Sequence, residues 1–401
     1  RDLVRSRGLG DVYKRQGPGD WPAAYRDPET EEVEDFARRE RDRVEFFHYL
    51  QWVADQQLTA AAEAAREGGC EIGLYHDLAL APDGGGAEAW GNRNVLAAGV
   101  ALGAPPDDWN LKGQNWGMPP YSPVGLRAAG YQPFIDVIRA NMRNAGALRL
   151  DHAMWLERMY WIPDGADPHD GGYVRNPVDD LMGILALESQ RQRCLVIAED
   201  LGTVPEGFRD RMRAAEMMSY RLLFFSVEDA GEFLAPKDYV APAAVAVSTH
   251  DLATLAGFWK ERDLNVRTEL GLYPSEQARD GAHRQRAGEK RALLRALKKE
   301  GVLSPGFPED VEEFSFELVT AVYRFLARTP CRLLLVSLED AFGETDQVNL
   351  PGTTTEHPNW KRKVRVALER FADDPRLIAI AGAISEERAA RNAVGDSGNA
   401  G

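Results

Sequence analysis

Four acidic residues lie at or just past the ends of four predicted strands: Asp77, Asp151, Glu199 and Asp251. Catalytic side chains at the carboxyl ends of several strands are typical of α/β barrels. Two carboxyl groups held about 5 to 5.5 Å apart can cleave a glycosidic bond with retention, because one attacks the anomeric carbon while the other protonates the leaving oxygen. The pattern therefore predicts a carboxylate site suited to glycoside chemistry.

Asp151 and Glu199 have the surroundings that such a pair requires. Arg149 lies two residues before Asp151 on one predicted strand, so both side chains point to the same face and the guanidinium would keep the carboxylate ionised. Glu199 follows the apolar run 196–198, which would raise its pKa and keep it protonated until needed. We therefore expect Asp151 to be the nucleophile and Glu199 the general acid and base.

Asp251 is the third candidate, and two interpretations of it stay open. Preceded by Thr249 and His250, it could receive hydrogen bonds from sugar hydroxyls and stabilise an oxocarbenium-like transition state, with His152 and His250 as further hydroxyl ligands. Alternatively, it could be the N-cap of a helix over 252–259, since one aspartate at a strand end is more often a cap or an ion-pair partner than a catalyst. Four such residues on four strands favour a site.

The segments that would hold these carboxylates alternate between helix and strand. Apolar periodicity predicts helices over 45–66, 134–144, 178–191, 205–213 and 316–327. Short apolar runs predict six strands, over 71–75, 147–150, 194–198, 220–225, 243–248 and 332–337. The alternation indicates a parallel sheet with helices outside, either closed or doubly wound, and the carboxylates at the strand ends decide for a barrel. We expect the first two barrel strands to lie upstream of this chain.

The segment 76–133 is rich in Gly, Pro and Trp, so we expect a long loop that contacts substrate. Trp and Tyr side chains can stack on the C–H faces of sugar rings. Trp116 and Tyr121 are the better candidates because polar and small residues flank them. The other aromatic candidates are Trp109, Trp155, Tyr160, Trp161 and Tyr173, of which about half are expected in the core.

The catalytic barrel is expected over 17–385, and we expect this segment to form only part of a complete barrel. Within it the charged stretch 263–308 predicts a helical insertion with a solvated face. The basic segment 1–16 is interpreted as non-native or disordered, and 386–401 as a frayed tail.

The composition limits the partners. Sixty-three Asp and Glu residues against 48 Lys and Arg give a formal charge of −15, a field that repels nucleic acids and anionic membranes. No apolar run approaches the roughly 18 to 20 residues of a membrane-spanning helix, and no signal-peptide pattern is present. Cys70, Cys194 and Cys331 lie far apart and in no metal spacing, which is typical of reduced thiols. We expect a cytoplasmic protein with a neutral or cationic small substrate.

Several motifs together resemble the amylomaltases, or 4-α-glucanotransferases, of the α-amylase clan. The resemblance covers nearly all of the chain from about Trp21. It rests on GAPPDDWNLKGQNWGMPPY at 103–121, LRLDH at 148–152, AEDLGTV at 198–204, THD at 249–251, and 347–353 with Asn359 and Trp360. These motifs are similar to the acceptor loop, nucleophile, acid/base, third-carboxylate and last-strand regions of the family. Ala153, Met154 and Trp155 resemble the longer bacterial members. Members of the family carry the first barrel strands in an upstream region that this chain lacks, so we expect an N-terminally truncated chain.

The resemblance implies a (β/α)8 TIM-type barrel with no organic cofactor and no metal. It makes Asp151 the nucleophile, Glu199 the acid/base and Asp251 the stabiliser of the transition state. The substrate contacts that it implies are Arg149, His250, Asp77, Gln114, Trp116 and Asn359. The implied reaction transfers α-1,4-glucan segments from a maltooligosaccharide donor to a second one, which replaces water as the acceptor.

Three other functions stay open. A hydrolase of the α-amylase clan would use the same triad with water, although the segment 103–121 argues against it. A metal-dependent barrel would bind a divalent ion through the carboxylates, but no lysine lies beside these strand ends to serve as the base of an enolase-like site. A truncated barrel with open sheet edges could bind glucan while being weakly active or inactive.

Overall fold

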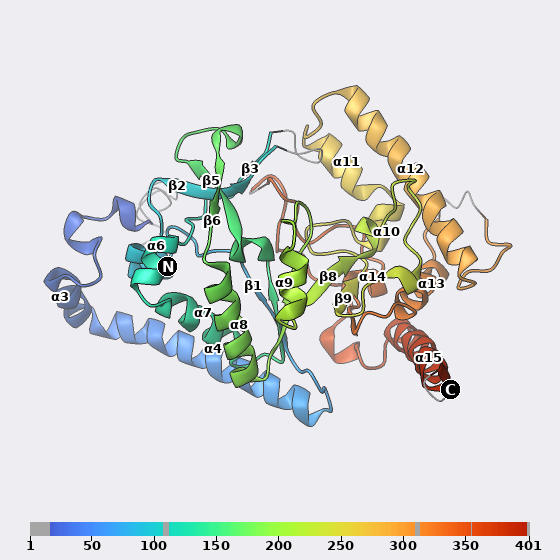
Figure 1. Cartoon of the computed structure of the whole chain (residues 1–401), viewed down its shortest axis with the longest axis horizontal. Coiled ribbons are helices and arrows are strands. Elements are labelled where there is room, and N and C mark those ends of the chain that lie inside the picture. Colours follow the sequence, from blue (N-terminus) through green and yellow to red (C-terminus); the bar gives the residue numbers. More distant parts are fainter. Residues whose placement is uncertain (1–16, 107–111, 309–312, 354, 399–401) are drawn as a thin grey trace. The chain divides into compact units, whose positions relative to one another are not determined.

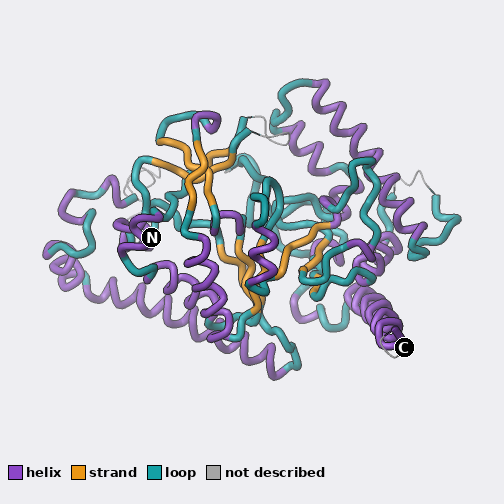
Figure 2. The backbone as a smooth tube through the Cα atoms, viewed as in Figure 1, coloured by secondary structure: helices purple, strands orange, loops and turns teal. Residues whose placement is uncertain are grey.

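The computed structural model describes residues 17–106, 112–308, 313–353 and 355–398, with side chains as far as residue 391. The segment 1–16 and Trp109 lie outside the described residues. Contacts divide the chain into two compact units, the first ending at Met218 and the second beginning at Ser219. Figure 1 shows the elements in sequence colours and Figure 2 their secondary structure.

Three strands form a parallel sheet in the first unit: β1 (Tyr75–Leu78), β4 (Ala147–Leu150) and β7 (Leu195–Ala198). The last two lie where strands are predicted, whereas β1 begins only at the last residue of the predicted strand 71–75, so Asp77 lies within it. The register pairs Asp77 with Arg149 and Arg149 with Ile197. All four residues of the central strand β4 are buried, as expected for a strand covered on both faces. The sheet therefore brings the polar residues at its carboxyl ends side by side.

Helix α7 (Gln132–Met142) shows why the helices of this unit form where they do. Its residues Phe134, Ile138 and Met142 recur every four positions and are all buried, so they make one apolar stripe against the core. The helix packs on α8 (Val178–Gln192). The remaining helices of the unit outside the segment 76–133 are η1 (Pro18–Asp20), η2 (Ala23–Tyr25), α3 (Glu31–Arg39), α4 (Arg41–Glu67), η4 (Ala153–Leu156), η5 (Pro168–Asp170) and α9 (Phe208–Ala214).

The segment 76–133 is not the structureless loop that the sequence predicts. It contains α5 (Ala87–Gly91), η3 (Arg93–Val95), β2 (Val100–Ala104), β3 (Gln114–Asn115) and α6 (Pro123–Ala128). The two strands join β5 (Arg158–Pro163) and β6 (Gly172–Arg175) in an antiparallel sheet of order β3-β2-β5-β6. A side chain at Gly103 would collide with the carbonyl of Gln114 and with Ile162, so only glycine allows this pairing.

The second unit, from Ser219 onward, contains the other strands of the parallel pattern, β8 (which begins one residue earlier, Met218–Leu222), β9 (Ala243–Ala246) and β10 (Leu333–Leu334), paired in parallel in that order. The predicted strand 220–225 ends at Leu222, because its last three residues form a 3-10 helix. Helix α13 (Phe316–Ala327) has the predicted bounds, and most of its residues are buried. The other helices are η6 (Leu223–Phe225), η7 (Pro236–Asp238), α10 (Leu255–Trp259), α11 (Arg262–Glu269), α12 (Glu276–Lys299), α14 (Leu338–Phe342), η8 (Leu368–Arg370) and α15 (Pro375–Gly398).

The charged stretch 263–308 is helical, as α11 and α12. Leu293, Leu294 and Leu297 of α12 are buried in the core, so this helix also has an apolar face. The residues from 386 onward are not a frayed tail, because α15 runs to Gly398. Ion pairs from Arg324 and Arg328 to Glu387 attach this helix to α13 and the residue after it.

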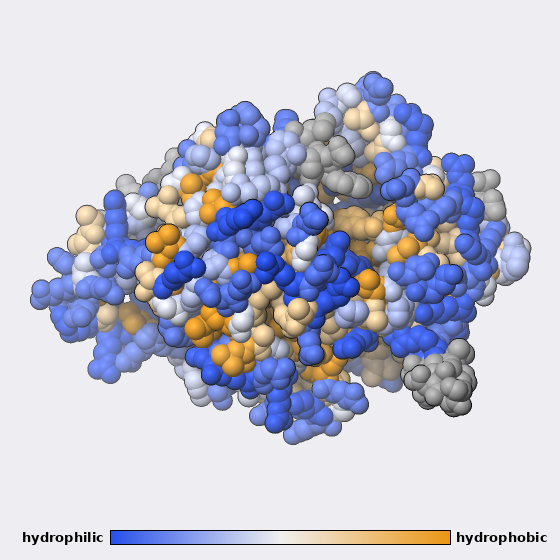
Figure 3. Space-filling model, in the orientation of Figure 1, coloured by the Kyte–Doolittle hydropathy of each residue, from blue (hydrophilic) through white to orange (hydrophobic). Residues whose placement is uncertain are grey.

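The face shown in Figure 3 is mainly hydrophilic, with scattered hydrophobic side chains, in keeping with the 28% of charged residues. Among the helices that the structure describes, none is both long enough and apolar enough to cross a bilayer.

Candidate active site

The carboxyl ends of the strands in the first unit place two carboxylates against the guanidinium of Arg149. Its Nη1 lies 2.7 Å from Oδ1 of Asp77, and its Nη2 lies 2.7 Å from Oδ1 of Asp151. Arg149 is buried, whereas the two aspartates remain partly exposed. The predicted placement of Arg149 and Asp151 on one face of the strand is confirmed.

The charges around Arg149 reinforce one another. Burial by itself would lower the pKa of Arg149, but the negative charges of Asp151 and Asp77 outweigh burial and raise that pKa above its ordinary value. The guanidinium is therefore a permanent positive charge at the base of the site. It provides Asp151 with a fixed counter-ion from its own strand.

Glu199 has different surroundings, because it is only 8% exposed. Its Oε2 accepts a hydrogen bond from the backbone N–H of His152 at 2.9 Å, and its Oε1 accepts one from Leu201 at 2.7 Å. Burial raises the pKa of Glu199 to about 7, assisted by Asp151, although these two N–H groups and Arg149 oppose the rise. The rise in pKa is the direction that the sequence predicts, and it suits a group that must both give and take a proton.

His152 connects the carboxylates to the antiparallel sheet. Its backbone lies in the left-handed region with φ of 45°, and its ring centroid lies 5.5 Å from that of Trp116. Burial lowers the pKa of His152 against the attraction of Asp151, which favours a neutral imidazole. The indole N–H of Trp116 donates to Oε1 of Gln114 at 3.2 Å. Three predicted substrate contacts, His152, Trp116 and Gln114, are thus linked through their side chains.

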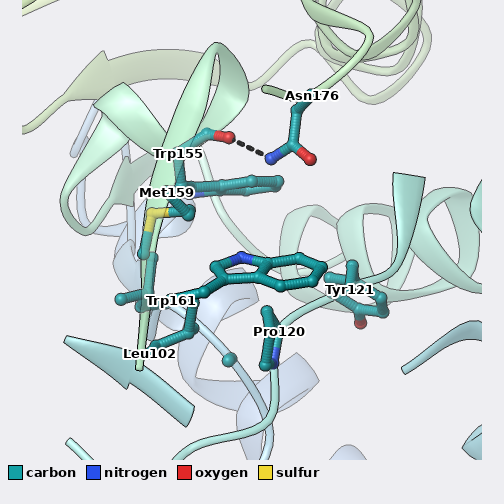
Figure 4. A pocket seen from close by; sticks show the side chains of 9 residues that line it. Leu102, Pro120, Tyr121, Trp155, Met159, Trp161 and Asn176 are labelled. Carbon is teal, nitrogen blue, oxygen red and sulfur yellow. Dashed lines mark hydrogen bonds between the residues drawn. The ribbon is translucent and has the colours of Figure 1, made fainter. Parts of the chain in front are cut away.

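Tyr121 lines a small pocket of the first unit together with other aromatic candidates (Figure 4). Its hydroxyl donates to Oε1 of Glu88 at 3.1 Å. The pocket is mostly apolar, and Asn176, whose amide donates to the carbonyl of Trp155, is its polar member. The full lining is Leu80, Ala81, Leu102, Pro120, Tyr121, Trp155, Met159, Trp161 and Asn176. Trp155 is buried, as expected for part of the aromatic set.

In the second unit, Asp251 is held by amide and imidazole groups. The side-chain amide of Asn349 donates to Oδ1 of Asp251 at 2.7 Å, and Nε2 of His250 lies 3.3 Å from Oδ2. The alternative interpretation of Asp251 as a helix N-cap is wrong, because α10 begins later and Thr254 caps it through Gly257. Asn349 was not predicted as a site residue, although it lies inside the region 347–353 that carries the family resemblance.

Asn359, a predicted substrate contact, is bound into its own loop, whereas the neighbouring Trp360 is exposed. Oδ1 of Asn359 accepts from the backbone of Leu350 at 2.9 Å, and its Nδ2 donates to Oγ1 of Thr353 at 2.9 Å. The amide predicted to contact substrate therefore closes its own loop. The next residue, Trp360, is 63% exposed and lies beside His250, with ring centroids 4.9 Å apart.

The described residues contain no group of three or more His, Cys, Asp or Glu side chains placed to hold a metal ion. Cys70 is exposed, Cys194 and Cys331 are buried, and all three are free.

Comparison with known proteins finds a family and relatives that carry the same description, 4-alpha-glucanotransferase. Residues 7–368 match the family described as 4-alpha-glucanotransferase. The 4-alpha-glucanotransferase of Haemophilus influenzae is 39% identical over 325 residues, which are 80% of this chain and 46% of that protein. That of Mycobacterium tuberculosis (strain H37Rv) is 40% identical over 358 residues, 88% of this chain and 48% of that protein. The chain thus spans about half the length of the curated relatives it matches.

Solved structures show the same fold. Amylomaltase from Corynebacterium glutamicum superposes with a TM-score of 0.81 at 32% identity, over 86% of this chain and 50% of that one. Amylomaltase from Streptococcus agalactiae in complex with acarbose gives a TM-score of 0.73 over 94% and 70%, and at 17% identity it supports the fold alone. The predicted fold class, a TIM-type barrel of the α-amylase clan, is confirmed.

Proposed function

Because the chain belongs to the 4-alpha-glucanotransferase family, we propose that the protein transfers α-1,4-glucan segments between maltooligosaccharides by a retaining double displacement. One observation carries the mechanism, the contrast between the two carboxylates of the first unit. Asp151 is ion-paired with a buried guanidinium, whereas burial raises the pKa of Glu199 to about 7. Environments that differ in this way assign one carboxylate to attack and the other to proton transfer.

In the first step, a carboxylate oxygen of Asp151 bonds to C1 of the donor sugar as the bond from C1 to the leaving oxygen breaks. Glu199 gives its proton to that oxygen, and the shortened chain departs. Arg149 pairs with Asp151 and holds it in place at the strand end. The neutral imidazole of His152 is a ligand for a sugar hydroxyl.

In the second step, the 4-hydroxyl of an acceptor glucan gives its proton to Glu199 while its oxygen bonds to C1 and displaces Asp151. One α-1,4 bond has broken and one has formed, so the step needs no external oxidant or reductant. Asp251 is the third carboxylate, which accepts hydrogen bonds from sugar hydroxyls as positive charge develops. Its fixed contact with Asn349 supports this role.

Substrate binding rests on the remaining polar and aromatic residues. Trp116 offers an aromatic face next to His152, on which a glucose unit can stack through its C–H groups. Asp77, Gln114, Tyr121 and His250 complete the proposed set of contacts. One structural neighbour was solved with acarbose bound. We place the protein in the cytoplasm, and its three free thiols support this location.

The test is incubation of the chain with maltotriose, followed by chromatography of the products. Transfer predicts glucose together with maltooligosaccharides longer than the substrate. Products that are only shorter would establish a hydrolase, and binding without turnover would establish a glucan-binding fragment.

Two matched variants then test the assigned roles. Asp151→Asn and Glu199→Gln keep the shape of each side chain, so each should lower the transfer rate by about 10⁴-fold or more in a chain that still folds. A variant that retains near-full activity would remove its residue from the mechanism.

A further inference from the structure

Trp360 combines two features that folding alone does not favour. Its indole is 63% exposed, which leaves a large aromatic surface in water. Its backbone has φ of 58°, in the left-handed region that bulky side chains rarely adopt. A conformation of this kind persists where the surroundings impose it, and such residues cluster at binding sites.

The loop before Trp360 imposes this conformation. The side chain of Asn359 closes the loop by accepting from Leu350 and donating to Thr353, and the backbone N–H of Trp360 donates to the carbonyl of Val348 at 3.1 Å. The residue after Val348 is Asn349, whose amide orients Asp251. One short segment therefore fixes both the exposed indole and the candidate third carboxylate.

The surroundings of the indole suit a sugar ring. The ring of His250 lies 4.9 Å from that of Trp360, with 46° between their planes, and its Nε2 lies 3.3 Å from a carboxylate oxygen of Asp251. A pyranose presents an apolar C–H face and a rim of hydroxyl groups. An open aromatic face beside an imidazole, which in turn contacts a carboxylate, can bind both.

We propose that Trp360 is a specificity-determining residue, whose indole stacks on a glucose unit of the α-glucan that His250 and Asp251 bind through hydroxyls. The assignment rests on the proposed function, because it takes the α-glucan as ligand. In this assignment Asn359 holds the loop in its conformation, and the neighbouring Trp360 contacts the substrate.

The test compares Trp360→Ala, Trp360→Phe and the control Leu368→Ala, which removes an apolar side chain of the same unit that is 74% exposed. Binding of maltoheptaose is measured by calorimetry in an Asp151→Asn background, which prevents turnover. Values of kcat and KM on maltotriose are measured with Asp151 intact. We expect Trp360→Ala to weaken maltoheptaose binding and to raise KM, each by roughly tenfold, which corresponds to about 1.4 kcal/mol.

In the same experiment kcat should change by less than about threefold, Trp360→Phe should retain most of the affinity, and Leu368→Ala should match the parent. Unchanged Kd and KM in Trp360→Ala would overturn the proposal, as would a loss of affinity that only follows a lowered melting temperature. If the parent chain transfers no glucan but binds maltoheptaose in a Trp360-dependent manner, the inference stands and the proposed transferase activity fails.

Discussion

Asp151 and Asp251 both follow a strand of a parallel sheet, and the two units hold them by different means. Asp151 is paired with a buried guanidinium that comes from its own strand, two residues earlier. Asp251 is oriented by the amide of Asn349, which arrives from a distant part of the chain, and by the adjacent imidazole of His250. The first arrangement places a permanent positive charge beside Asp151, and the second fixes the orientation of Asp251.

This difference matches the two proposed roles. A nucleophile must be ionised at the moment of attack, and a nearby full positive charge favours that state. A carboxylate that binds sugar hydroxyls gains more from a fixed orientation, because each hydrogen bond depends on angle and distance. Changes at the charged partner should therefore cost more activity than changes at the neutral partner.

Among the residues that hold the two aspartates, the largest effect is expected from Arg149→Ala. The substitution leaves Asp77 and Asp151 side by side without their shared counter-ion, so kcat/KM on maltotriose should fall by about 10³-fold. Arg149→Lys is the matched control, since it keeps a positive charge but not a guanidinium that bridges both carboxylates. It should recover part of the loss. A decrease of less than about tenfold in the alanine variant would show that the positive charge of Arg149 is not what distinguishes the surroundings of Asp151 from those of Asp251.

Asn349→Ala tests the neutral partner. Removing the amide removes the hydrogen bond from Asn349 that orients Asp251, so kcat should fall by roughly 10- to 100-fold while KM changes little. Asn349→Asp, which keeps the size but places a second carboxylate beside Asp251, should be worse than alanine. A KM effect that exceeds the kcat effect would mean that Asn349 contacts substrate directly and does not act through Asp251.

The contact of Arg149 with Asp151 and the contact of Asn349 with Asp251 also differ in how well the sequence predicts them. Arg149 and Asp151 are two residues apart, so the alternation of side chains on a strand predicts their contact. Asn349 and Asp251 are separated by 98 positions, and the loop that joins them follows no periodic pattern. Even the family resemblance marked the region without identifying Asn349.

The antiparallel sheet was missed for the same physical reason. Strand β2 is short, contains a glycine that is unfavourable in most strands, and pairs with β5 across more than fifty residues. In contrast, β4 and α13 have apolar patterns that are complete within themselves, and both were predicted with the observed bounds. Local patterns were sufficient where burial is regular, but not where distant chain segments determine the geometry.

The pH dependence should distinguish the two clusters next. Because burial raises the pKa of Glu199 from 4.5 to about 7, the acid form is lost as pH rises through 7, and kcat/KM should fall about tenfold per pH unit above that value. In Glu199→Gln the residual activity should lack this limb. A limb that persists in the variant would assign the titration to another group.

The same pKa shift has a consequence for stability. Folded Glu199 retains a proton that the unfolded chain releases between about pH 4.5 and 7, so the free energy of unfolding should decrease across that window as pH rises. Buried Asp340, whose pKa burial raises to about 6, acts in the same direction. The contribution of Glu199 is therefore read from the difference between the parent and Glu199→Gln.

The smallest effect on activity is expected at Asp340, a buried aspartate of the second unit. Its Oδ1 accepts from the backbone of Leu255 at 2.6 Å, and its Oδ2 accepts from the hydroxyl of Tyr323 at 3.0 Å. It thus joins α14 to the start of α10, just after the turn that carries Asp251. In Asp340→Asn the amide oxygen can still accept from Leu255, so kcat/KM should stay within about threefold and the stability loss should be on the order of 1 kcal/mol.

Asp340→Ala is the companion variant, because it leaves the N–H of Leu255 buried without an acceptor and should cost about 2 to 4 kcal/mol. Asp251→Asn, the same change in the same unit, should instead lower kcat/KM by at least about 100-fold with an unchanged melting temperature. The comparison of Asp340→Asn with Asp251→Asn then separates an aspartate that supports the fold from one that acts on the substrate. Equal losses of activity in both asparagine variants, at equal stability, would make the charge of Asp340 part of the chemistry.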